Sequence, residues 1–127
     1  MTMAIKKIVL ALVVLWFAVG GVGHFVAPDF FMKIVPPSLP YRLEAVYVSG
    51  FFELLGAAGL LVAALRRAAG LGLIALTVAV TPANVYMWAN PDLFPAIPEV
   101  LLALRLVLQA ALIAAIWWST QRPGHRR

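Results

Sequence analysis

Four apolar runs of roughly twenty residues constrain the fold of this chain more than any other feature. They cover about residues 8–27, 41–65, 71–89 and 99–118. A helix of about 20 residues rises about 30 Å, which is the thickness of a bilayer's hydrocarbon core. Lipid-exposed backbone must satisfy its own hydrogen bonds, and no run alternates with the period of two that a barrel strand requires. We therefore predict an all-α polytopic membrane protein, with residues 1–127 forming one four-transmembrane-helix bundle.

Composition excludes the competing classes. The chain is 64% hydrophobic and 12% charged, whereas soluble domains are usually about 45–50% apolar and about 25% charged. Disorder needs low hydrophobicity, and 127 residues leave no room for a soluble catalytic domain beside four spans. The absence of cysteine excludes disulfides, thiolate metal sites, iron–sulfur clusters and any thiol relay of the chain's own.

Charged residues at the ends of the runs predict the orientation. One side of a four-span chain would carry Lys6, Lys7, Arg66, Arg67, Arg122, Arg126 and Arg127. The other side would carry two basic residues, Lys33 and Arg42, offset by Asp29, Glu44, Asp92 and Glu99. The positive-inside rule then places both termini in the cytoplasm, with the chain in a plasma (bacterial inner) membrane. The net charge of +5 therefore reflects topology, and we expect no nucleic-acid partner.

The first run also has features of a signal peptide. Lys6 and Lys7 precede an apolar core, and Ala18-Val19-Gly20 resembles a cleavage site. The apolar run continues to Ala27, which favours a full span.

Prolines shape the two external loops, at 28–40 and 90–98. Pro28 can open a short apolar helix that lies at the membrane interface or is tucked over the bundle, and Pro40 and Pro98 each fit the first turn of the next span. Pro82 predicts a kink within the third span. Close contact between helices is predicted at Gly50, Gly56, Gly59, Gly70 and Gly72.

Every span contributes a polar residue in its outer half, when depth is measured with a rise of about 1.5 Å per residue. The residues are His24, Glu53, Asn84, Arg105 and Gln109. Ionisable groups in a membrane are costly and usually face the bundle interior, so we predict one shared polar layer as a candidate ligand-binding site.

Within this layer the obvious ion pair is Glu53 with Arg105, because an unpaired charge costs at least about 2.5–3.5 kcal/mol on insertion scales. Alternatively the pair only sets the helix register, with Asn84 and Gln109 as hydrogen-bonding glue. His24 is either a titrating group at the external mouth or a packing residue.

Several chemistries have no basis in this sequence. A bis-histidine haem needs two histidines within the spans, and only His24 lies in one. One histidine and one glutamate do not make a metal site, and neither a phosphate-binding loop nor a nucleophile motif is present. No catalytic residue is assigned.

The polar positions and their surroundings resemble the DoxX family of small four-helix membrane proteins. The resembling stretches are Gly23-His24-Phe25 with Pro28, Ile34-Val35-Pro36-Pro37 with Leu39-Pro40, Ser49-Gly50 with Glu53-Leu54, Pro82-Ala83-Asn84, and Arg105-Leu106 with Gln109. Val107 follows the arginine–leucine pair, where many relatives carry proline. The resemblance implies links to thiosulfate–quinone oxidoreduction, to oxidative-stress complexes or to the assembly of receptor channels.

The leading hypothesis is an accessory or assembly subunit of a membrane complex, possibly redox-linked, that is not an enzyme by itself. Its expected partners are the lipid bilayer, another membrane protein or a second copy, and a lipophilic small molecule. One alternative is a quinone- or lipid-binding redox component, with quinone as the cofactor. The other is a small proton-coupled transporter that uses Glu53.

Overall fold

The computed structural model describes residues 2–121, and within this range it contains helices and no strand. The helices are α1 (Thr2–Val26), α2 (Pro28–Ile34), α3 (Arg42–Leu60), α4 (Arg66–Ala79), α5 (Thr81–Ala89) and α6 (Glu99–Thr120). Two 3₁₀ turns, η1 (Ala63–Leu65) and η2 (Pro91–Leu93), lie in the connections before α4 and before α6.

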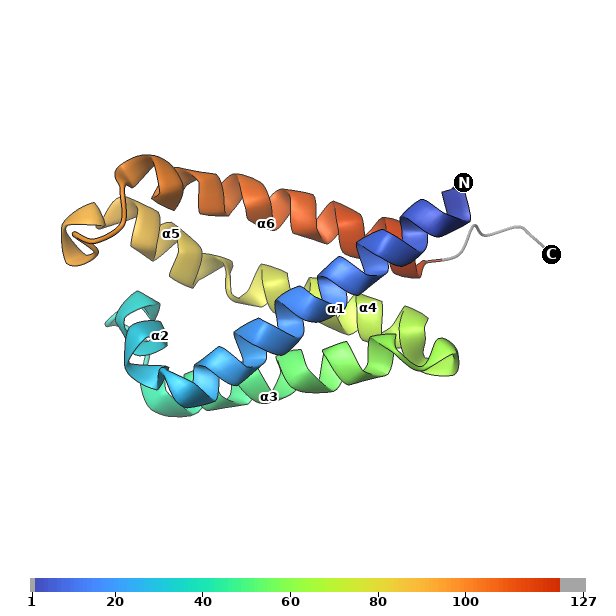
Figure 1. The fold of residues 1–127 in the computed structure, drawn as a ribbon. Coiled ribbons are helices and arrows are strands. Elements are labelled where there is room, and N and C mark those ends of the chain that lie inside the picture. Colours follow the sequence, from blue (N-terminus) through green and yellow to red (C-terminus); the bar gives the residue numbers. More distant parts are fainter. Residues whose placement is uncertain (1, 122–127) are drawn as a thin grey trace.

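The described residues are all-helical, as predicted, and four of their helical segments are long and apolar enough to cross a membrane. They are Thr2–Val26, Arg42–Leu60, Ala63–Ala89 and Glu99–Thr120. The start of α1 and the end of α6 lie at one end of the bundle, and α2 and the α5–α6 connection lie at the other (Figure 1). At the first end, Nζ of Lys6 lies 5.6 Å from the ring centroid of Trp118.

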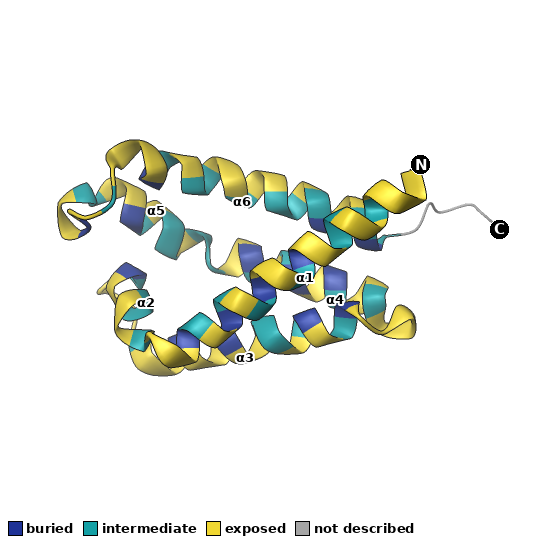
Figure 2. Ribbon diagram, viewed as in Figure 1, coloured by how far each residue is buried: buried dark blue, intermediate teal, exposed yellow. Residues whose placement is uncertain are grey.

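The outer face of the bundle is largely apolar. Exposed residues cover most of the long helices (Figure 2), and they include large aliphatic side chains such as Leu12, which is 60% exposed, and Val107, which is 64% exposed. A water-soluble protein rarely exposes such extended apolar surface. This surface fits a bundle that meets lipid along its length.

Two buried clusters form the core. The first packs Val13, Phe17, Ala57, Leu60, Leu73 and Ile116. The second lies around α2 and the α5–α6 connection and packs Ile34, Met87, Phe94 and Leu102. Side chains from both clusters border the cavity described below, so the core leaves an opening between its two halves.

The kink predicted at Pro82 is confirmed. The third span is interrupted at Val80, which separates α4 from α5. Proline has no backbone N–H and its ring collides with the preceding turn, so an unbroken helix is disfavoured there. The Thr81 hydroxyl donates to the Thr77 carbonyl at 3.2 Å and bridges the break.

The loop helix α2 begins at Pro28, as predicted, and is tucked over the bundle against α3 and α5. Arg42 anchors its C-terminal end by donating from one guanidinium nitrogen to the carbonyls of Met32, at 2.6 Å, and Val35, at 3.2 Å. Arg42, expected from the sequence to act only as a loop charge, therefore also caps a helix.

Three details differ from the predictions. Pro40 precedes α3 instead of lying in its first turn, because Tyr41 takes a left-handed conformation with φ 55° and the helix begins at Arg42. Pro98 is the residue before α6. Gly72 meets no neighbouring atom within 4 Å, whereas a Cβ at Gly50 would lie 2.6 Å from that of His24, so Gly72 is not at a helix contact.

Candidate functional site

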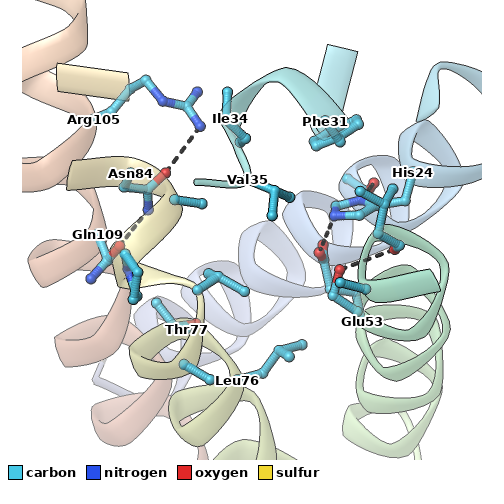
Figure 3. Close-up of a pocket in the computed structure, with 18 of the residues that line it drawn as sticks. His24, Phe31, Ile34, Val35, Glu53, Leu76, Thr77, Asn84, Arg105 and Gln109 are labelled. Atoms are coloured by element: carbon cyan, nitrogen blue, oxygen red, sulfur yellow. Dashed lines mark hydrogen bonds and ion pairs between the residues drawn. The ribbon is translucent and has the colours of Figure 1, made fainter. Parts of the chain in front are cut away.

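A cavity of about 420 Å³ opens between the two core clusters and is lined by residues from all six α-helices. All five polar residues singled out in the sequence line it: His24, Glu53, Asn84, Arg105 and Gln109. The structure therefore brings the predicted set together. They do not form one continuous layer, because they occupy two separate walls of the cavity (Figure 3).

The first wall carries a polar pair between α1 and α3. Nε2 of His24 lies 3.2 Å from Oε2 of Glu53. Glycines on the two helices permit this approach, since a Cβ at Gly20 would lie 2.8 Å from Oε1 of Glu53 and a Cβ at Gly50 would collide with His24. Small residues let membrane helices pack closely, and here they bring the two polar side chains into contact.

The second imidazole nitrogen determines how the pair shares its protons. Nδ1 of His24 lies 2.7 Å from the carbonyl oxygen of Gly20, and a carbonyl only accepts hydrogen bonds, so Nδ1 carries a proton. A further proton is needed between Nε2 and Oε2, because a bare nitrogen lone pair would face a carboxylate. Whether that proton lies on His24 or on Glu53, the pair as a unit is electrically neutral.

The helix α2 completes this wall. The ring of Phe31 stacks on the imidazole of His24, with centroids 4.0 Å apart and planes inclined by 19°. The sequence indicated α2 only as a short apolar helix, and the stacking of Phe31 was not predicted. The contact covers the polar pair with an aromatic ring.

The opposite wall carries a chain of hydrogen bonds between α5 and α6. Arg105 donates to Oδ1 of Asn84 at 3.3 Å, and the Asn84 amide donates to Oε1 of Gln109. The Gln109 amide in turn donates to the Thr81 hydroxyl at 2.6 Å. The chain thus runs from a cation to the hydroxyl that bridges the α4–α5 break.

The predicted pair of Glu53 with Arg105 is wrong. Glu53 contacts His24 and Arg105 contacts Asn84, on opposite sides of the cavity (Figure 3). The reason lies in the packing order of the helices. Glu53 on α3 faces α1, with which α3 packs most extensively, and Arg105 on α6 faces α5.

Apolar side chains make up most of the remaining lining, including Trp16, Leu76, Leu108 and Leu112. Thr81, which is not among the five residues assigned to the site from the sequence, ends the hydrogen-bond chain of the second wall. Its position one helical turn from Asn84 and beside Pro82 was the available signal.

Fold and cavity together define a class, a bundle of four helical segments long and apolar enough to span a membrane, with a cavity that is lined mainly by apolar side chains and carries polar groups on two walls. Within that class, the chain belongs to the family described as a domain of unknown function (DUF8561), whose model matches residues 12–120. The match extends from the first half of α1 to the end of α6 and so includes every residue of both polar walls. Neither a curated protein nor a solved structure gives a significant match.

Proposed function

We propose that this protein binds a lipophilic small molecule with a polar head group in the cavity, and that it does so as an accessory subunit of a membrane complex. The observation that carries the proposal is the cavity itself, about 420 Å³ in volume with polar groups on two facing walls. Small-molecule sites are typically concave, mostly apolar, about 300–1,000 Å³ in volume, and fixed by a few polar groups.

The polar groups suit recognition better than catalysis. Arg105, Asn84 and Gln109 are held by one another, and His24 is held by Glu53 and the Gly20 carbonyl. Groups fixed in this way orient a bound molecule. A quinone held here would serve a redox partner, in keeping with the resemblance to the DoxX family, and the chemistry would take place in that partner.

The proposed orientation has both termini in the cytoplasm. Lys6 lies near the start of α1, and Arg66 and Arg67 begin α4. These helix starts lie at the end of the bundle where α6 finishes, and α2 lies at the other end (Figure 1). By the positive-inside rule the end with these basic residues faces the cytoplasm and the cavity lies towards the outer face, as in a plasma or bacterial inner membrane. A reporter fused after Arg127 should be active on the cytoplasmic side, and an external readout would reverse the orientation.

Native mass spectrometry of the gently solubilised protein tests the binding function. We expect a lipophilic adduct on the wild-type protein, and loss of it in Ala83→Phe, which puts a ring into the cavity lining. The matched control is Ala75→Phe, at an exposed position on α4 outside the lining. A wild-type protein without a lipophile, or an adduct that survives in Ala83→Phe, would count against the proposal. A bound second protein would support the accessory role.

The proton shared by His24 and Glu53 favours one second candidate, proton-coupled transport. In that case Glu53→Gln, which keeps the shape of the side chain but cannot ionise, should abolish uphill uptake by proteoliposomes. If Glu53→Gln binds the lipophile as the wild type does, and the wild type shows no proton-coupled uptake, the transport function is contradicted and the binding function stands.

A further inference from the structure

The charge in the cavity is not balanced. Three of the residues that line it are ionisable, namely His24, Glu53 and Arg105. His24 and Glu53 neutralise each other through their shared proton. Arg105 remains with the neutral amide oxygen of Asn84 as its hydrogen-bond acceptor within residues 2–121. The cavity therefore carries the net positive charge of one guanidinium.

The hydrogen-bonding capacity of Arg105 is largely unused. A guanidinium has five N–H groups in a rigid fork. Asn84 accepts from one terminal nitrogen, and Nε is buried without a partner in the described part of the chain. The bonds from Asn84 to Gln109 and from Gln109 to Thr81 orient the Asn84 amide so that its oxygen faces Arg105. The N–H groups of the two terminal nitrogens that Asn84 does not use have no acceptor within residues 2–121 and are available to a molecule in the cavity.

We propose that the ligand is an amphipathic anion, with carboxylate or phosphate oxygens at Arg105 and an apolar chain along the leucine-lined wall. This inference rests on the proposed binding function and narrows it to one ligand class. The planar guanidinium fork matches the paired oxygens of a carboxylate or a phosphate. Leu76, Leu108 and Leu112 supply the apolar surface for the chain. The neutral His24–Glu53 pair on the opposite wall adds no net charge that would repel the anion.

Trp16 lines the cavity and provides a fluorescent reporter there. In a background of Trp88→Phe, Trp117→Phe and Trp118→Phe it is the remaining tryptophan of the four. The probes are dibromostearic acid, its methyl ester and a brominated phosphatidic acid, each added in detergent at a pH where the acids are ionised. Bromine quenches tryptophan fluorescence on contact. Quenching that is present in the wild type and lost in Ala83→Phe is attributed to a probe in the cavity.

We expect the acid to half-saturate this quenching at a concentration at least about ten-fold lower than its ester. Arg105→Gln should remove the difference. Arg67→Gln should preserve it, because Arg67 is an exposed cation in the first turn of α4, which begins at the other end of the bundle. Asn84→Asp provides a second variant that keeps the arginine, and its internal carboxylate should compete and weaken acid binding. Tighter binding of the brominated phosphatidic acid than of dibromostearic acid would identify the natural ligand as a membrane lipid. Tighter binding of dibromostearic acid would identify it as a free fatty acid.

Failure of the anion inference can be distinguished from failure of the proposed binding function. Equal quenching by acid and ester, with both lost in Ala83→Phe, overturns the anion inference and leaves the binding function intact. Acid binding that is unchanged in both Arg105→Gln and Asn84→Asp also overturns it. Absence of cavity quenching by all three probes, together with a wild-type protein that carries no lipophile, overturns the binding function as well.

Discussion

His24 on α1 and Glu53 on α3 meet at 3.2 Å, and Arg105 lies across the cavity against Asn84. Glu53 and Arg105 are thus held apart. Each contacts a different neighbour, so the space between them remains open. A direct bond between Glu53 and Arg105 would have crossed that space.

The first prediction concerns the energetic coupling of these residues. A double-mutant cycle on His24→Leu and Glu53→Gln should give a coupling free energy of about 1 kcal/mol, because interhelical polar contacts in membrane proteins reach roughly 0.6–1.7 kcal/mol. The free energy of unfolding would be measured by SDS titration in mixed micelles.

The matched cycle pairs Glu53→Gln with Arg105→Gln. Since these side chains make separate contacts, their effects should add within about 0.5 kcal/mol. Strong coupling in this second cycle, with none between His24 and Glu53, would restore the pairing expected from the sequence.

The depth of the polar residues in the bundle could be predicted from the sequence, but their hydrogen-bonding partners could not. Helical rise alone placed Glu53, Asn84 and Arg105 at a similar depth, and they do line one cavity. Their partners depend on which helices are neighbours and how each is rotated. Those choices follow from close packing at Gly20 and Gly50, and a pattern of apolar runs does not encode them.

The loops show the same division. Prolines predicted where α2 begins and where the third span breaks, because proline acts through local backbone geometry. The bonds from Arg42 to Met32 and Val35 are tertiary. In the sequence Arg42 is simply a basic residue beside a span, and its capping role becomes visible only in the folded chain.

The second prediction is that Asn84→Asp stabilises the ligand-free bundle. The new carboxylate gives Arg105 a charged acceptor, and Gln109 can rotate its amide to donate to it. We expect the free energy of unfolding to rise by about 1 kcal/mol. Asn84→Leu is the control with the opposite sign, since it leaves Arg105 and Gln109 without their partner and should cost about 1–3 kcal/mol. Similar losses in both variants would contradict the role given to Asn84.

The third prediction concerns the attachment of α2. Arg42→Gln removes the bonds to the carbonyls of Met32 and Val35, and α2 should then open more often than the long helices. Hydrogen exchange followed by mass spectrometry should show peptides from 28–40 exchanging about ten-fold faster, with α6 unchanged. Lys33→Gln is the control, because Lys33 is an exposed cation on α2. It should leave the exchange rate of these peptides unchanged. Uniform acceleration across the chain would instead indicate that Arg42 supports the whole bundle.

The fourth prediction uses two glycines with opposite surroundings. A Cβ at Gly50 would lie 2.6 Å from Cβ of His24 and 3.1 Å from the ring of Phe25, so Gly50→Ala must separate α1 from α3. Overpacking of this kind costs about 1–3 kcal/mol, and it should also draw His24 away from Glu53.

The matched control is Gly72→Ala, whose added methyl group meets no atom within 4 Å. Because alanine is the better helix former by about 0.8–1 kcal/mol, that variant should be as stable as the wild type or more so. SDS titration of both variants measures the difference. It should keep its sign in a His24→Leu background, because leucine retains the Cβ that the new methyl group would meet. Equal stability of the two variants would show that α1 and α3 do not pack closely at Gly50, and the His24–Glu53 contact would lose its structural basis.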